Sequence, residues 1–280
     1  KIKLIAVLFF NITRRYVDRI IMKINNKLFT LLLFVLLISC NEHIVDNLED
    51  YKGGVCLTFD DAYVDQWYKL SNSLIENNIK ATFFVTMINT LASSKLEKLQ
   101  TLDSLGFEIG CHGYKHIDAV KYLESHTLND YFYNEVLPAL NIMDKSDLHP
   151  KSYSYPYGMN NDSLDNYLLN YFEILRDVTD EQRKPLEKEV EKIDEIFCKK
   201  GESKIVSSLG IDINFNINES KLRNALQRAK ENKEILCVYA HCPVDSNAIS
   251  YQIEIGYIKN FISLIKEYEL NTYTFSELAK

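Results

Sequence analysis

The feature that most constrains the fold is an alternation of two patterns along the chain. Short apolar runs rich in Val, Ile, Phe and Tyr predict strands, and between them the apolar residues recur every three or four positions, which predicts helices. This alternation is typical of parallel βα units, and 280 residues suffice for one large α/β barrel. The predicted strands are 54–59, 81–85, 107–111, 152–155, 173–176, 204–207, 234–239 and 271–275, and the predicted helices are 66–77, 95–105, 128–143, 220–232 and 251–268.

The N-terminal region is expected to be a targeting segment and not part of the barrel. A basic stretch at 22–27 leads into an apolar core at 28–38 that ends in Ser39-Cys40, so residues 22–39 are predicted to be a signal peptide. The ending resembles the lipobox of bacterial lipoproteins, which implies lipidation at Cys40 and anchoring to a membrane. The alternative is an uncleaved transmembrane anchor.

The rest of the chain divides simply. Residues 1–21 are expected to be an upstream extension, 40–52 a polar tether, and 53–280 a single barrel domain. The charged stretch 180–200 has Glu and Lys at helical spacing and predicts a solvated helix. A net charge of -7 leaves no excess of Lys and Arg for binding phosphates, so nucleic acid is not an expected partner.

Polar residues come directly after several predicted strands. Asp60 and Asp61 follow the first strand, His112 and His116 follow the third, and His241 follows the seventh. The carboxyl ends of parallel barrel strands converge on one face, so we expect these side chains to meet there. Convergence of this kind is typical of an active site.

The histidine pair has the spacing of a metal site. Residues four apart lie on one side of a helical turn, so His112 and His116 can bind one cation. A carboxylate from Asp61 would complete a face that leaves coordination positions open, as a catalytic metal requires. The alternatives are a surface pair for the histidines, and a strand end or helix N-cap for Asp60 and Asp61.

Four motifs carry a resemblance to a known family. Their order and approximate spacing resemble those of the polysaccharide deacetylases, the NodB homology group or carbohydrate esterase family 4. The resemblance covers 55–275 and implies a distorted barrel of seven or eight βα units with one divalent ion, zinc first, with cobalt, nickel or iron as alternatives. The motifs are Thr58-Phe59-Asp60-Asp61, His112-x-x-x-His116, Tyr155-Pro156-Tyr157-Gly158 and Tyr239-Ala240-His241.

The resemblance also implies roles for single residues. It makes Asp61, His112 and His116 the metal ligands. It makes Asp60 the general base and His241 the general acid, with Pro156 and the backbone N–H of Tyr157 at the substrate and oxyanion position. Aromatic residues near the expected mouth can stack on sugars or pack in the core, and of these only Tyr157 is expected to line the site.

Three departures from the family pattern affect catalysis. Ser154 stands where the family usually has an Arg that hydrogen-bonds the catalytic Asp, and a serine cannot form a bidentate pair with a carboxylate. Arg176, at the end of the next predicted strand, is the expected substitute, with a surface salt bridge as the alternative. Gly113 replaces a common Ser or Thr. The acidic support of His241 is left open among Asp177, Asp180 and Asp212.

The expected activity is removal of N-acetyl groups from amino-sugar polymers such as peptidoglycan, chitin or poly-N-acetylglucosamine. The expected location is the bacterial cell envelope, on the periplasmic or exterior side. The alternative is a catalytically weak or inactive glycan-binding lipoprotein that keeps the metal face. A third interpretation is another amide or ester substrate, because the same metal face would cleave those bonds.

Overall fold

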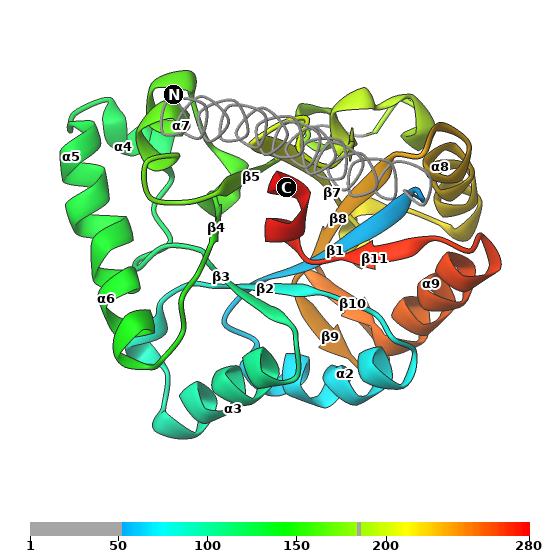
Figure 1. Cartoon of the computed structure of the whole chain (residues 1–280), viewed down its shortest axis with the longest axis horizontal. Coiled ribbons are helices and arrows are strands. Elements are labelled where there is room, and N and C mark those ends of the chain that lie inside the picture. The colour runs from blue at the N-terminus through cyan, green and yellow to red at the C-terminus, as the bar shows by residue number, and fades with distance from the viewer. Residues whose placement is uncertain (1–51, 184–185) are drawn as a thin grey trace, which may run out of the picture. The chain divides into compact units, whose positions relative to one another are not determined.

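Seven parallel strands close into a barrel in the computed structural model, which describes residues 52–183 and 186–280 (Figure 1). The main sheet has nine strands, of which β11 and β6 lie beside the ring, and the pairing of β1 with β8 closes the other seven. The expectation of an α/β barrel is confirmed. The ring consists of β1 (Gly54–Asp61), β2 (Thr82–Val85), β3 (Glu108–Cys111), β4 (Ser152–Ser154), β5 (Ile174–Val178), β7 (Ile205–Gly210) and β8 (Ile235–Ala240).

Helices surround this ring and bury its outer face (Figure 1). In α2, Trp67 stacks on Phe83 of β2 with ring centroids 5.3 Å apart, and Phe83 stacks on Phe59 of β1 at 5.5 Å. Burial of such large apolar surfaces is the main force that holds helices on a sheet. The helices are α2 (Val64–Glu76), α3 (Ser93–Ser104), α4 (Ala119–Leu123), α5 (Leu128–Tyr131), α6 (Leu137–Lys145), α7 (Asp162–Leu168), α8 (Glu219–Asn232) and α9 (Ile255–Glu267).

Helix α8 illustrates how the sequence sets an element. The Asn218 side chain accepts a hydrogen bond from the N–H of Lys221 at 3.0 Å and so caps the first turn, while Lys233 ends the helix in the left-handed conformation. Leu222, Ala225, Leu226 and Ala229 are buried at helical spacing. The helix therefore presents one apolar stripe to the sheet and its charges to solvent.

A C-terminal segment fills the barrel at the amino ends of its strands (Figure 1). Strand β11 (Asn271–Tyr273) pairs with the first half of β1, and Phe275 is fully buried with its ring edge against Phe84, 5.5 Å between centroids. Thr82 and Glu108, which begin β2 and β3, accept hydrogen bonds from the backbone of this segment. The end of the barrel at the amino ends of the strands is thereby sealed, and only the end at the carboxyl ends can hold a functional site.

The strands lie within a few residues of their predicted ranges, but one predicted helix is wrong. The stretch 180–200 forms, in its described residues, three separate 3-10 turns and the short strand β6 (Phe197–Cys198). Its β-branched residues are buried and hold it on the domain, whereas a solvated helix would expose them. Those buried residues are Val190, Ile193 and Ile196.

Two further differences concern helix boundaries. The predicted helix 128–143 is divided by the π-helical turn Phe132–Val136. The predicted helix 251–268 begins only at Ile255, because Gln252–Glu254 forms β10 and pairs with β9 (Cys242–Val244). The second difference reflects strand pairing, which hydrophobic periodicity does not report.

The predicted extension, the signal peptide with Cys40, and the tether up to Tyr51 lie outside the described residues. Residues 52–280 form one compact unit. No helix within 52–183 and 186–280 has the length and apolar character needed to cross a membrane.

We predict that Phe275→Ala lowers the free energy of unfolding by about 3–5 kcal/mol, because a fully buried aromatic side chain is lost from the sealed end of the barrel. Tyr133→Ala is the control, since Tyr133 is 62% exposed and its loss should change stability by less than about 0.5 kcal/mol. Urea unfolding measures both. Equal stability of the two variants would show that the segment does not seal the barrel.

Candidate active site

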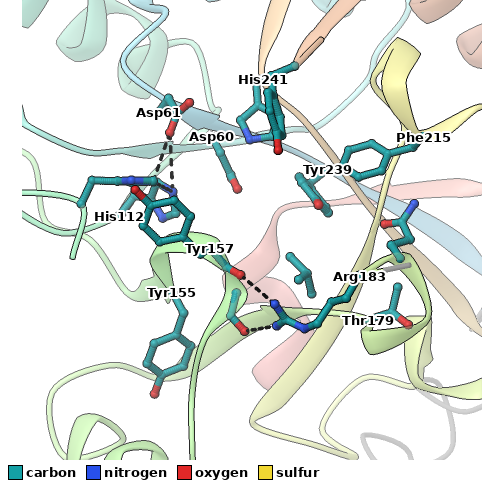
Figure 2. A pocket seen from close by; sticks show the side chains of 15 residues that line it. Asp60, Asp61, His112, Tyr155, Tyr157, Thr179, Arg183, Phe215, Tyr239 and His241 are labelled. Atoms are coloured by element: carbon teal, nitrogen blue, oxygen red, sulfur yellow. Dashed lines mark hydrogen bonds and ion pairs between the residues drawn. The ribbon is translucent and has the colours of Figure 1, made fainter. Parts of the chain in front are cut away.

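A cavity of about 420 Å³ opens at the carboxyl ends of the barrel strands. Its residues come from the carboxyl ends of six of the seven ring strands and from the segments that follow them, so closure of the ring is what brings them together. In Figure 2, Asp61 and His112 lie on one side of the cavity, and Tyr239 and Phe215 lie on the other. The lining residues are Asp60, Asp61, His112, His116, Tyr155, Tyr157, Gly158, Val178, Thr179, Gln182, Arg183, Phe215, Tyr239, His241 and Tyr251.

Three of the predicted residues form a cluster with the geometry of a metal site. The Nε2 atoms of His112 and His116 are 3.2 Å apart. An oxygen of Asp61 lies 3.4 Å from Nε2 of His116 and 3.8 Å from Nε2 of His112 (Figure 2). All three ligand atoms are within 4.8 Å of one another. Two nitrogens and one oxygen suit a divalent ion such as zinc with positions left for water or substrate.

The surroundings of His112 keep it in the form that binds a metal. Nδ1 of His112 lies 2.8 Å from the carbonyl oxygen of Ser154, and since a carbonyl only accepts, Nδ1 carries the proton and Nε2 presents its lone pair to the cluster. Burial, opposed by the charge of Asp60, lowers the pKa of His112 to about 4. Burial likewise lowers the pKa of His116. Both imidazoles are therefore neutral at neutral pH.

Asp60 forms a buried ion pair with Arg176. The guanidinium of Arg176 reaches across the barrel from β5, donates to Asp60 Oδ2 and to the Ser154 hydroxyl, and is fully buried. Arg176 also lies over the rings of Phe84 and Tyr239, 5.4 and 4.8 Å from their centroids. The other carboxylate oxygen, Oδ1, is buried and has no hydrogen-bond partner among the described residues.

His241 is held by Asp212, which follows β7. The Asp212 carboxylate accepts from Nδ1 of His241 at 2.6 Å and from its backbone N–H at 3.1 Å, and Trp67 donates its indole N–H to the His241 carbonyl at 3.0 Å. Burial alone would lower the pKa of His241, but the hydrogen bond and charge of Asp212 outweigh it, so the pKa is raised. Asp177 and Asp180, the other two candidates, make no hydrogen bond to His241.

The turn after β4 brings Tyr157 to the cavity, whereas Pro156 is buried beside it and is not a lining residue. Pro156 begins the 3-10 turn Pro156–Gly158, and Tyr157 adopts a left-handed conformation with φ 59°. The Tyr157 ring is 60% exposed and stands edge-on to His116, 4.6 Å between centroids. Asp61 and His116 also have positive φ, 85° and 60°. Left-handed backbone at non-glycine residues is costly and is concentrated at functional sites.

Several residues around the site were not found from the sequence. Arg183 donates to the backbone carbonyls of Tyr157 and Gly158 (Figure 2). Phe215 and Tyr251 also line the cavity, and the Tyr251 ring stands edge-on to His241 with 5.2 Å between centroids. Glu135 is fully buried behind the histidine loop, and burial raises the pKa of its carboxyl group to about 7 despite three backbone hydrogen bonds. The predicted site residues are recognised in the sequence because they come directly after a predicted strand. None of these further residues does.

Residues 48–171 match the family model of the polysaccharide deacetylases. The matched residues include the Asp60–Asp61 pair and both histidines of the cavity. The comparison with curated protein sequences gives no match.

Solved structures share the fold over most of their length. A family 4 carbohydrate esterase from Streptomyces lividans, in complex with acetate, is 15% identical with a TM-score of 0.51, covering 79% of this chain and 91% of its own. A polysaccharide deacetylase from Bacillus cereus is 18% identical with a TM-score of 0.51, covering 80% and 92%. A chitin deacetylase from the fungal pathogen Colletotrichum lindemuthianum is 19% identical with a TM-score of 0.51, covering 81% and 87%. The fold is the seven-stranded barrel of carbohydrate esterase family 4.

We predict that Arg176→Ala lowers the free energy of unfolding by about 3–5 kcal/mol, because it leaves the Asp60 carboxylate buried without its counter-charge. Ser154→Ala should cost less, about 1–3 kcal/mol, because it removes one acceptor and keeps the ion pair. Arg223→Ala, which breaks surface pairs on α8, is the control. If Arg176→Ala unfolds in urea at the same midpoint as Arg223→Ala, the ion pair does not stabilise the site.

Proposed function

We propose that this protein is a divalent-metal-dependent hydrolase that removes N-acetyl groups from an amino-sugar polymer or oligosaccharide at the cell envelope. One observation carries the proposal: Asp61, His112 and His116 converge in the same cavity as Asp60 and His241. A metal-ligand set, a carboxylate and a supported histidine in one cavity are the groups that amide hydrolysis needs.

The residues fit a divalent ion. His112 and His116 would hold it through Nε2 and Asp61 through a carboxylate oxygen, with the Ser154 carbonyl fixing the ring of His112. A bound divalent ion would supply Lewis-acid polarisation of the acetamide carbonyl and of the attacking water. The donor set suits zinc, and cobalt, nickel and iron are also compatible with it.

The chain's own groups divide the proton transfers. Asp60 takes the proton from the attacking water through Oδ1, while Arg176 holds Oδ2 and keeps the carboxylate in place. His241 donates a proton from Nε2 to the departing amine, with Asp212 at Nδ1 stabilising its protonated form. The backbone N–H of Tyr157 and the fixed turn at Pro156 provide the oxyanion position.

Arg176 also bears on the non-catalytic alternative. That alternative rests on Ser154, which stands where the family resemblance implies an Arg that orients Asp60. In the structure Arg176 contacts both Asp60 and Ser154 from the neighbouring strand. The guanidinium is therefore supplied from a different position, and the reason to prefer a binding protein over an enzyme is removed.

The proposed location rests on the sequence before the barrel. The basic and apolar stretches of 22–38 followed by Ser39-Cys40 support export and lipid attachment at Cys40. Metabolic labelling with a fatty-acid analogue tests this, with Cys40→Ala as the control. Labelling of both proteins, or of neither, would contradict the lipid anchor.

We predict that residues 41–280 release acetate from N-acetylated amino-sugar oligomers and that a chelator abolishes this release until a divalent ion is restored. Acetate is measured enzymatically over a panel of chitin, peptidoglycan and poly-N-acetylglucosamine fragments. Absence of release from every substrate, despite bound metal, would favour the glycan-binding alternative.

We predict that His112→Ala loses bound metal together with activity, because one of three ligands is removed. His126→Ala is the matched control, since His126 lies on the surface and outside the cavity. Metal content after gel filtration is measured by mass spectrometry. An unchanged content in His112→Ala would mean that the ligand assignment is wrong.

The support of His241 predicts the pH dependence of the reaction. A general acid must be protonated, so kcat/KM should fall as pH rises through the His241 pKa, and the raised pKa extends activity to higher pH. Asp212→Asn removes the charge that raises this pKa and should move the alkaline limb to lower pH. Asp177→Asn changes a half-buried carboxylate that makes no hydrogen bond to His241 and should leave the limb in place. An identical limb in all three proteins would exclude His241 as the titrating acid.

A further inference from the structure

The loop between the two histidines is held by one side chain from a distant helix. Glu135 lies in the π-helical turn Phe132–Val136 and is fully buried. Its Oε2 accepts from the N–H of Lys115 at 2.8 Å, and its Oε1 accepts from the N–H of Ile117 at 2.9 Å. Its backbone carbonyl accepts from the N–H of Tyr114 at 2.8 Å. A single residue thus binds the backbone of the whole turn that carries His116.

Gly113 is the residue that makes room for this carboxylate. A Cβ atom at position 113 would lie 2.2 Å from Oε1 of Glu135, far inside van der Waals contact, and Gly113 has φ +86°. The carbonyl of Gly113 accepts from the N–H of Met87 at 3.2 Å and from the hydroxyl of Thr86 at 3.1 Å. The loop is therefore held on one side by Glu135 and on the other by the segment after β2.

We propose that Glu135 is a positioning residue that sets the geometry of the metal site through the backbone of 114–117, and that Gly113 is required for its carboxylate to enter. The inference rests on the proposed metal site. His116 itself has a left-handed backbone, so the loop needs external hydrogen bonds to hold its imidazole toward His112. Glu135 supplies these to the residues on both sides of His116 and does not touch the substrate cavity.

The central test is the metal affinity of Glu135→Gln, measured by competition with a chromophoric chelator for Zn²⁺ and Co²⁺. The glutamine amide turns one acceptor into a donor that faces a backbone N–H, so the loop loses a hydrogen bond and gains a repulsion. Outer supports of metal ligands are typically worth about 10–100-fold in affinity, and we expect a loss in that range. The absorption spectrum of bound Co²⁺ should change as well.

The matched control is Glu108→Gln at the sealed end of the barrel. Glu108 accepts hydrogen bonds from Thr82, Ser152 and the backbone of Ser276, so the same substitution removes a comparable polar cluster away from the histidines. Both variants should be less stable than the parent protein in chelator, but only Glu135→Gln should lose metal affinity. Unchanged affinity in Glu135→Gln, with a parent protein that binds metal, overturns the inference. A parent protein that binds no divalent ion overturns the proposed function instead.

Two further measurements do not depend on how Glu135→Gln folds. In the metal-free parent protein, the amides of Tyr114, Lys115 and Ile117 should be protected from hydrogen exchange. Exchange at the rate of an exposed loop would contradict the proposal that Glu135 holds this loop. Gly113→Ala should weaken metal binding more in the parent background than in Glu135→Ala, because the clash needs both partners. Additive effects of the two substitutions on metal affinity would exclude a coupling between Gly113 and Glu135.

Discussion

The pairing of β1 with β8 is the constraint on which the rest of the structure depends. Parallel hydrogen bonding from Gly54↔Ile235 to Phe59↔Ala240 converts an open sheet into a ring. The Thr58 hydroxyl adds a hydrogen bond to the carbonyl of Val238 across the same seam. Because both strands run in register to their carboxyl ends, Asp60 and His241 emerge beside one another although 181 positions separate them. Without this seam the metal ligands and the proposed general acid would belong to opposite edges of a sheet.

Inside the ring, the side chain that pairs with a buried charge can come from any strand that faces that charge. Arg176 stands on β5 and reaches the same carboxylate that an arginine on β4 would reach, and the Ser154 hydroxyl on β4 accepts from its Nε and Nη2. Aromatic rings from β2 and β8 cover the guanidinium. The position of a supporting residue in the sequence is therefore less constrained than its position in space, provided that the buried charges are paired.

The sequence predicted the barrel and the convergence of Asp61, His112 and His116 because both follow from local patterns. Apolar runs mark the strands, and each of these polar side chains comes directly after a strand or within the loop that follows it. The support for these residues was harder to predict. Asp212 was one of three candidates because its contact with His241 depends on how far β7 extends beyond its predicted end, to Gly210. The role of Glu135 could not be predicted, because the residues around a glutamate in a helix do not indicate whether a distant loop packs over its side chain.

The segment that seals the barrel has a consequence for folding order. Strand β1 is synthesised first among the ring strands, yet its neighbours on the ring and at the sealed end include β8 and β11, which are made last. Contacts over such sequence separations form slowly, because a long loop must close before they contribute stability. The nascent barrel therefore has an unpaired β1 edge and an uncovered interior until residues 235–275 emerge. Under the proposed export, this delay would leave the chain unfolded while it crosses the membrane.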